Sequence, residues 1–301
     1  ALDTDATTAV TTCPYCGNPT AIAGQMSKAV KPDFVIPFRL EKKDAIEALK
    51  NYYKGKRLLP KSFTNGNHLD KIQGVYVPFW LFSGTSHADM TFEGRDNETS
   101  RHTVNSTMDC MNLSKQFDIS DLSNNFRGDV QVTRTKVYDV HRKGDVSFSR
   151  IPADGSSTMP DDLMDSIEPF DYKDLKPFSM AYMPGFLANR YDVEKEEVQP
   201  RIIDRAEHTT ADEMRASVHH DSVTEKSRDI RTDLKKPEYA VFPVWLLSTS
   251  WNGQNFLFAM NGQTGKMIGN LPIDGGKRAA YLGGITVVLS AIFYLIFRLM
   301  G

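Results

Sequence analysis

The carboxyl-terminal part of the chain carries an uncharged apolar run, and this run limits the possible folds more than any other feature. Residues 279–297 read AAYLGGITVVLSAIFYLIF. A helix of this length extends about 28 Å, which matches the hydrocarbon thickness of a lipid bilayer. Tyr281 and Tyr294 lie near its ends, where aromatic rings favour the membrane interface. The sequence therefore predicts a transmembrane helix over residues 279–298, and a buried core helix is the alternative.

Basic residues around the apolar run predict its orientation in a membrane. Lys277 and Arg278 precede the run, whereas Arg298 follows it. Further cations lie upstream at Lys226, Arg228, Arg231, Lys235 and Lys236. Lys and Arg are enriched on the cytoplasmic side of membrane helices. We therefore expect a single-pass protein whose large amino-terminal part lies in the cytoplasm.

A Cys-x-x-Cys knuckle lies near the amino-terminal end, at Cys13 and Cys16, and Gly-Asn-Pro follows it. Two thiolates at this spacing form half of a tetrahedral zinc site. A complete site needs a second pair, and the chain has one other cysteine, Cys110. The knuckle therefore predicts a half zinc ribbon in residues 1–25. A thioredoxin-like redox pair is the alternative, but Gly-Asn-Pro disfavours the helix that such a pair needs.

Residues 30–275 combine helical and strand patterns, which predicts a cytoplasmic α+β body rich in strands. Apolar residues recur at helical spacing over residues 42–53 and, more loosely, over residues 194–220. Residues 127–151 contain several alternating, strand-like runs.

Two similar segments indicate an internal repeat within this body. Residues 77–83 read VPFWLFS and residues 242–248 read FPVWLLS; we call these the echo segments. Each leads into a hairpin-like stretch, and residues 74–94 are expected to form a strand pair around a short turn. The sequence thus predicts two related β modules near residues 74–94 and 238–272, sharing one core or packed side by side. We expect the tryptophans, Trp80 and Trp245, to anchor the core. A ligand-binding platform is the alternative.

A basic cluster follows the predicted helix over residues 42–53. Its members are Lys54, Lys56, Arg57 and Lys61. Such a cluster is a candidate site for phosphate, anionic lipid or an acidic partner. A solvated surface that complements the helix dipole is the alternative.

A nucleotide-binding loop is excluded by spacing. The stretch Gly262-Gln-Thr-Gly265-Lys266 has two residues between its glycines, and Met267 follows the lysine. A phosphate-binding loop needs four residues there and Ser or Thr after the lysine. We therefore expect a hairpin turn and no bound nucleotide. The net charge of −2 gives no general argument for nucleic-acid binding.

The remaining candidates for chemistry are titratable clusters. His219 and His220 are adjacent, and Asp161, Asp162 and Asp165 lie close together in the sequence. The acids also fit the first turn of a helix after a proline, and the histidines fit a helix end. We therefore predict that the protein is not an enzyme, and an enzyme that uses these histidines or acids is the alternative.

The pieces together resemble a bacterial family of TFIIB-type zinc-ribbon membrane proteins, whose members are often labelled primosomal-helicase-like. Besides the apolar run, the resemblance covers TTCPYCGNP at 11–19, KPDFVIPFRLEKKDAIEALKNYYKGKRLLPKSF at 31–63, GVYVPFWLF at 74–82, DGSSTMPDDLMDSIEPFDY at 154–172 and FAMNGQTGK at 258–266.

This resemblance implies partners and a cofactor. In the family, a second cysteine pair lies upstream of the equivalent of residue 1, so the resemblance implies zinc bound by Cys13, Cys16 and that pair. Some members are encoded beside SPFH (flotillin-like) or phage-shock-protein-A-like proteins. The resemblance thus implies a membrane-anchored adaptor in the bacterial cell membrane, which brings such partners to the bilayer under envelope stress. A zinc-ribbon nucleic-acid-binding protein linked to replication is the alternative.

Overall fold

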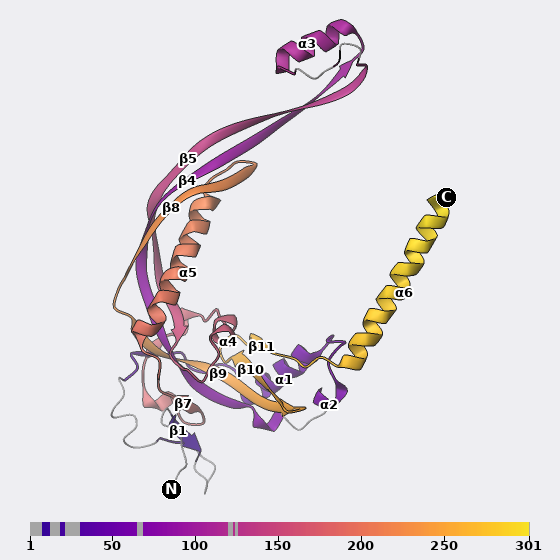
Figure 1. The fold of residues 1–301 in the computed structure, drawn as a ribbon. Helices are drawn as coiled ribbons and strands as arrows, with labels where there is room; N and C mark the ends of the chain where they lie inside the picture. Colours follow the sequence, from indigo (N-terminus) through magenta and orange to yellow (C-terminus); the bar gives the residue numbers. More distant parts are fainter. Residues whose placement is uncertain are drawn as a thin grey trace. The chain divides into compact units, whose positions relative to one another are not determined.

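The computed structural model shows a strand-rich α+β chain with one apolar helix at its carboxyl-terminal end (Figure 1). The structure describes residues 8–12, 19–21, 31–64, 69–119, 123 and 126–300. The chain divides into two compact units. The first unit comprises residues 1–82, 150–199 and 236–301, and the second comprises residues 83–149 and 200–235.

A mixed β-sheet forms the centre of the first unit. Its strands follow the order β11-β10-β9-β4-β7-β1-β2, and β3 pairs with β9 and β6. The strand bounds are β1 Thr8–Thr12, β2 Pro19–Ala21, β3 Phe34–Val35, β4 Gln73–Val104, β6 Lys176–Pro177, β7 Leu187–Asn189, β9 Glu238–Trp251, β10 Gln254–Asn261 and β11 Met267–Gly269. The helices that begin and end here are α1 Lys42–Tyr53, α2 Lys61–Thr64, α4 Asp161–Ser166 and α6 Gly275–Met300, with 3₁₀ turns at Leu69–Lys71, Tyr172–Asp174 and Met180–Tyr182.

Helix α1 has the bounds that its sequence predicts. Glu41 caps its first turn, where the Glu41 N–H donates to the Asp44 carboxylate at 2.8 Å. Ala45 and Leu49 are buried on one side of the helix. Gly55, with φ of +77°, lies just beyond its end, and glycine adopts this left-handed backbone conformation without a steric cost.

The echo segments lie in neighbouring antiparallel strands, with Val77 of β4 opposite Phe242 of β9. Trp80 and Trp245 are 6% and 7% exposed, so the prediction that they anchor the core is confirmed. Trp245 belongs to a buried cluster that includes Phe258, and a second buried cluster includes Phe79 and Phe242.

The prediction of a strand pair within residues 74–94 is wrong. These residues belong to β4, which continues from Gln73 to Val104 without a turn. Residues 73–81 pair with β9, and residues 84–95 pair with β8. The pairing partner changes within one unbroken strand: residues 74–82 are all buried, and alternating burial begins at residue 83, as expected where side chains point to opposite faces of a sheet.

The predicted hairpins near the carboxyl-terminal end are confirmed. β9 and β10 pair in antiparallel fashion around Asn252 and Gly253, which both have positive φ, as a tight two-residue turn requires. Residues 262–266 connect β10 to β11, its antiparallel partner.

The second unit is built on a three-stranded sheet in which β4 pairs with both β5 and β8. Strand β5 spans Gly128–Asp154, so the several runs seen in residues 127–151 form one strand, and β8 spans Ser222–Leu234. Helix α5, Lys195–Ala216, confirms the helical pattern predicted over residues 194–220. Met90 and Phe92 of β4 form a small buried cluster with Ala211 of α5.

A short helix, α3, Thr107–Phe117, connects β4 to β5. Ser106 caps it, accepting a hydrogen bond from the Asp109 N–H at 3.1 Å. Cys110 and Leu113 are buried beside Val104, and the Cys110 thiol donates to the Ser123 carbonyl at 3.0 Å.

Candidate membrane-surface site

Helix α6 presents an apolar surface that the rest of the described structure leaves uncovered. In the part of the chain that the structure describes, one helix is long and apolar enough to cross a membrane, spanning Gly275–Arg298. Val287, Phe293 and Phe297 are 69%, 77% and 79% exposed. None of its most apolar stretch is buried, so a buried core helix does not fit. A lipid environment would remove this surface from water.

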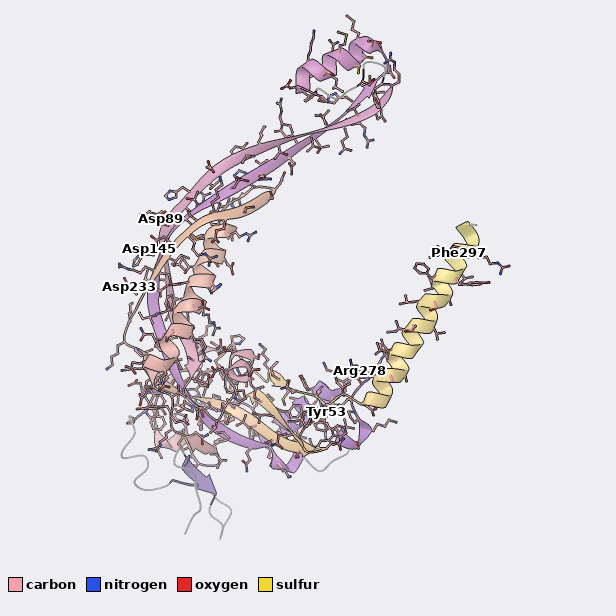
Figure 2. All side chains as sticks on the ribbon, in the orientation of Figure 1. Tyr53, Asp89, Asp145, Asp233, Arg278 and Phe297 are labelled. Atoms are coloured by element: carbon pink, nitrogen blue, oxygen red, sulfur yellow. The ribbon has the colours of Figure 1, made fainter. Side chains whose placement is uncertain are left out.

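The start of α6 is attached to residues 54–61, which comprise the loop that follows α1 and the first residue of α2. The Asp274 N–H donates to the Leu58 carbonyl at 2.9 Å. The Lys277 ammonium donates to the Leu59 carbonyl at 2.6 Å. Figure 2 labels Tyr53 and Arg278, which mark the two segments that these hydrogen bonds join.

Residues of both segments, the one after α1 and the one before α6, pack against the same buried apolar cluster. Leu59 and Phe63 are buried in the cluster that contains Phe258, and Leu271 packs against the same cluster just before α6. Tyr53 contacts Phe63 with ring centroids 5.9 Å apart, and burial raises the pKa of Tyr53 to about 12. The loop and the residues just before α6 are therefore held by the same hydrophobic cluster.

The four predicted cations, Lys54, Lys56, Arg57 and Lys61, are all exposed on this segment, with Lys61 at the start of α2. The Lys54 ammonium donates to the Asn51 side chain at 2.6 Å. The Lys56 ammonium lies 5.4 Å from the centre of the Tyr52 ring. Among the described residues, none of the four forms an ion pair with a carboxylate.

Two further cations join this set: Lys277 and Arg278. The sequence assigned them a role in orientation and gave no sign that they meet residues 54–61, because more than two hundred residues separate the two segments. Asp274 lies beside them, and its carboxylate accepts a hydrogen bond from the Lys277 N–H at 3.0 Å, at the first turn of α6.

The predicted zinc ligands, Cys13 and Cys16, lie outside the described residues. Within the described residues, no group of three or more His, Cys, Asp or Glu side chains is placed to hold a metal ion. The zinc site therefore stays a prediction.

The titratable candidates have local structural partners. His219 and His220 lie just after α5, which ends at Ala216. His220 contacts the Asp96 carboxylate at 3.0 Å and stacks on the Tyr138 ring at 4.8 Å between centroids. The acids Asp161, Asp162 and Asp165 lie in α4, which belongs to the other unit.

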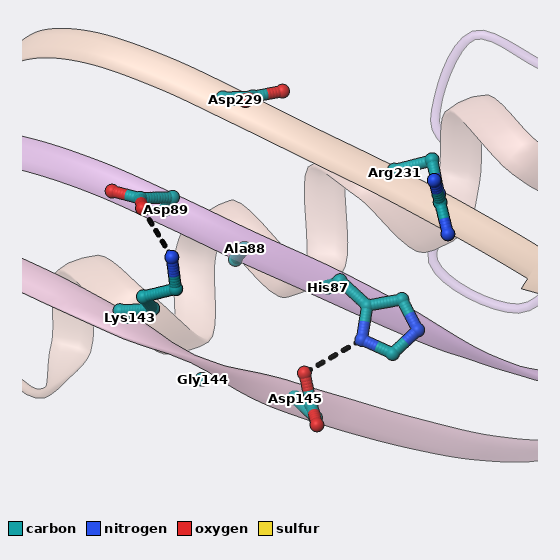
Figure 3. A pocket seen from close by; sticks show the side chains of 8 residues that line it. All are labelled: His87, Ala88, Asp89, Lys143, Gly144, Asp145, Asp229 and Arg231. Atoms are coloured by element: carbon teal, nitrogen blue, oxygen red, sulfur yellow. Dashed lines mark hydrogen bonds and ion pairs between the residues drawn. The ribbon is translucent and has the colours of Figure 1, made fainter.

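A shallow pocket of about 350 Å³ lies on the second unit, on the sheet formed by β4, β5 and β8 (Figure 3). His87 contacts the carboxylates of Asp145 at 2.7 Å and Asp233 at 3.5 Å. Lys143 contacts Asp89 at 2.9 Å, and its hydrogen bond is the main cause that lowers the pKa of Asp89. Within the pocket, Lys143 pairs with Asp89 and His87 pairs with Asp145, and both pairs join β4 to β5.

Comparison with known proteins places the chain in a family. Over 281 residues it is 32% identical to the uncharacterized protein YdjG of Bacillus subtilis (strain 168), a match that covers 93% of this chain and 75% of that relative. No family model matches the chain, and no solved structure matches it. At this identity and coverage, the chain belongs to the family of Bacillus subtilis YdjG.

Proposed function

We propose that this protein is a non-enzymatic adaptor, anchored in the bacterial cell membrane by α6, with its body in the cytoplasm. The observation that carries the proposal is the exposed apolar helix α6, whose first residues are hydrogen-bonded to a folded body. A body held beside a bilayer raises the local concentration of any partner that it binds. The partners that we propose are SPFH (flotillin-like) or phage-shock-protein-A-like proteins, and the setting is envelope stress.

The body of this adaptor contains, as we propose, two related β modules. Matching hydrogen bonds support this relationship. The Trp80 indole N–H donates to the Val193 carbonyl at 3.0 Å, and the Trp245 indole N–H donates to the Leu40 carbonyl at 3.2 Å. In the next residues, the Glu194 N–H donates to the Glu197 carboxylate at 3.3 Å, as the Glu41 N–H does to Asp44.

The strand pairing repeats in the same way. β3 pairs in parallel with β9, and β7 pairs in parallel with β4. The Gly155 N–H donates to the Pro78 carbonyl at 2.9 Å, and the Gly262 N–H donates to the Pro243 carbonyl at 2.8 Å. These parallels support the proposal of related modules near residues 74–94 and 238–272, in which β7 lies beside β4 and β3 lies beside β9.

The third part of the proposal is the half zinc ribbon, with Cys13 and Cys16 as two of four zinc ligands. Its support is the knuckle sequence itself, because thiolates at this spacing suit zinc.

Affinity purification tests the adaptor. The full-length protein is isolated from native membranes in mild detergent, and co-purifying proteins are identified by mass spectrometry. We expect an SPFH or phage-shock-protein-A-like protein to co-purify. The partner should be lost when residues 279–301 are deleted and retained when an unrelated membrane helix replaces them. Recovery of replication proteins or nuclease-sensitive material instead would reject the adaptor in favour of nucleic-acid binding.

A further inference from the structure

We propose that residues 54–61 and the first turn of α6 together form a contact site for anionic phospholipid headgroups. The site consists of Lys54, Lys56, Arg57, Lys61, Lys277 and Arg278. It rests on the membrane anchoring proposed above and adds a chemical preference for the membrane surface.

The position of the site relative to the lipid bilayer follows from its attachment to α6. Lys277 lies two residues before the uncharged run that begins at Ala279, which is about 3 Å along the helix axis. The headgroup layer on each side of a bilayer is about 5–7 Å thick. Since the Lys277 ammonium is hydrogen-bonded to Leu59, the loop lies at the level of the headgroups when α6 crosses the bilayer.

The charge of the site favours anions. Residues 54–61 and 271–278 contain the six cations and a single carboxylate, Asp274. That carboxylate already accepts the Lys277 N–H at the start of α6. Among the described residues, none of the six cations has a carboxylate partner. The ammonium groups of Lys54 and Lys277 each donate one hydrogen bond within the protein, and each has further N–H donors for lipid phosphates. Lys and Arg near an anionic leaflet are attracted to it.

The shape of the loop suits a surface contact. Gly55, with φ of +77°, turns the chain between Lys54 and Lys56, and both of these side chains are exposed. Ile273, which precedes α6, is 57% exposed. An exposed apolar side chain just ahead of Lys277 and Arg278 in the chain suits the boundary between headgroups and acyl chains, where both kinds of group find partners.

Hydrogen exchange of the full chain in lipid nanodiscs tests the site. One disc contains phosphatidylcholine alone, and the other contains in addition roughly a third phosphatidylglycerol, an anionic lipid. We expect peptides that cover residues 54–61 to exchange roughly threefold more slowly in the anionic disc, and high salt to reduce this difference because it screens surface charge. Peptides from β9 report whether the fold is intact.

A charge-neutralised variant provides the second arm. In the variant Lys54→Gln, Lys56→Gln, Arg57→Gln and Lys61→Gln, the difference between the two discs should disappear. The matched control removes the same number of charges from the second unit: Lys136→Gln, Lys143→Gln, Lys226→Gln and Arg231→Gln. This control should keep the slow exchange of residues 54–61 in the anionic disc.

The outcomes separate this proposal from the one on which it rests. A chain that enters neither disc refutes membrane anchoring, and the lipid site with it. A chain that enters both discs and exchanges equally in both refutes the lipid site while anchoring stands. Equal protection by duplex DNA added to phosphatidylcholine discs would reassign the cluster to nucleic acid.

Discussion

The two units of the molecule use different means to order their strands. In the first unit, aromatic side chains fill the core: Phe242 contacts Phe79 and Phe170 with ring centroids 4.8 and 4.6 Å apart. In the second unit, α5 covers a small apolar cluster around Met90 and Phe92. Ion pairs on its sheet join β4 to β5 (Figure 3), and His87 of β4 also contacts Asp233 of β8.

This difference teaches where each unit obtains its stability. Burying a large apolar side chain contributes roughly 1.5–3 kcal/mol, whereas exposed ion pairs contribute little and are screened by salt. We therefore infer that the first unit is the more stable of the two. The second unit opens more readily, as parts with few buried contacts do.

The largest effect should come from the core of the first unit. Phe242→Ala removes a fully buried ring, and such a change costs about 3–5 kcal/mol. Denaturant unfolding of the detergent-solubilised chain, followed by tryptophan fluorescence, measures the loss, because Trp80 and Trp245 both lie in this unit. Met180→Ala, at a side chain that is 44% exposed, is the control and should change stability little. A loss from Phe242→Ala no larger than that of the control would contradict the aromatic core.

A smaller and more local effect should follow from Met90→Ala in the second unit. Met90 is fully buried beneath α5, and truncation of such a side chain costs about 2–5 kcal/mol, with the low end expected where the site can collapse. Hydrogen exchange should accelerate in β8 and in residues 83–95, while β9 keeps its protection. Met108→Ala, at a position 73% exposed, is the matched control. Equally accelerated hydrogen exchange in both units would show that they unfold together, and would contradict the inferred difference in their stability.

The smallest loss of stability per residue should come from protonating carboxylates of the second unit with acid. The carboxyls of Asp89 and Glu225 have lowered pKa values, chiefly because Lys143 and Arg228 donate hydrogen bonds to them. A carboxyl whose folded pKa is depressed stabilises the fold above its unfolded pKa, near 4. That contribution is lost as pH falls through the folded value. We expect protection of β8 to decline as pH falls from about 5 to 3.

A variant sharpens this last prediction. Arg228→Gln removes the donor to Glu225 and should weaken the acid dependence of exchange in β8. An unchanged pH profile in the variant would show that the ion pair between Arg228 and Glu225 does not contribute to the stability of β8.

Several elements could be predicted because their signals are local. Helix α1 follows from apolar spacing, with Gly55 just beyond its end. The turn at Asn252 and Gly253 follows from residue types that accept positive φ. The strand pair in residues 74–94 was predicted wrongly, because nothing local tells a turn from a change of pairing partner within one long strand. The zinc ligands and the partners stay predictions.

The candidate site likewise combines features that local sequence predicts with contacts that it does not predict. The sequence by itself determined that Lys54, Lys56, Arg57 and Lys61 form a basic cluster and that α6 is apolar and long enough to cross a bilayer. Only the tertiary structure brought the two together, through hydrogen bonds from Asp274 and Lys277 to the loop. Helical spacing and charge runs depend on neighbours in the chain. Contacts across two hundred residues depend on how the whole core packs, since only collective burial offsets the entropy of closing so long a loop.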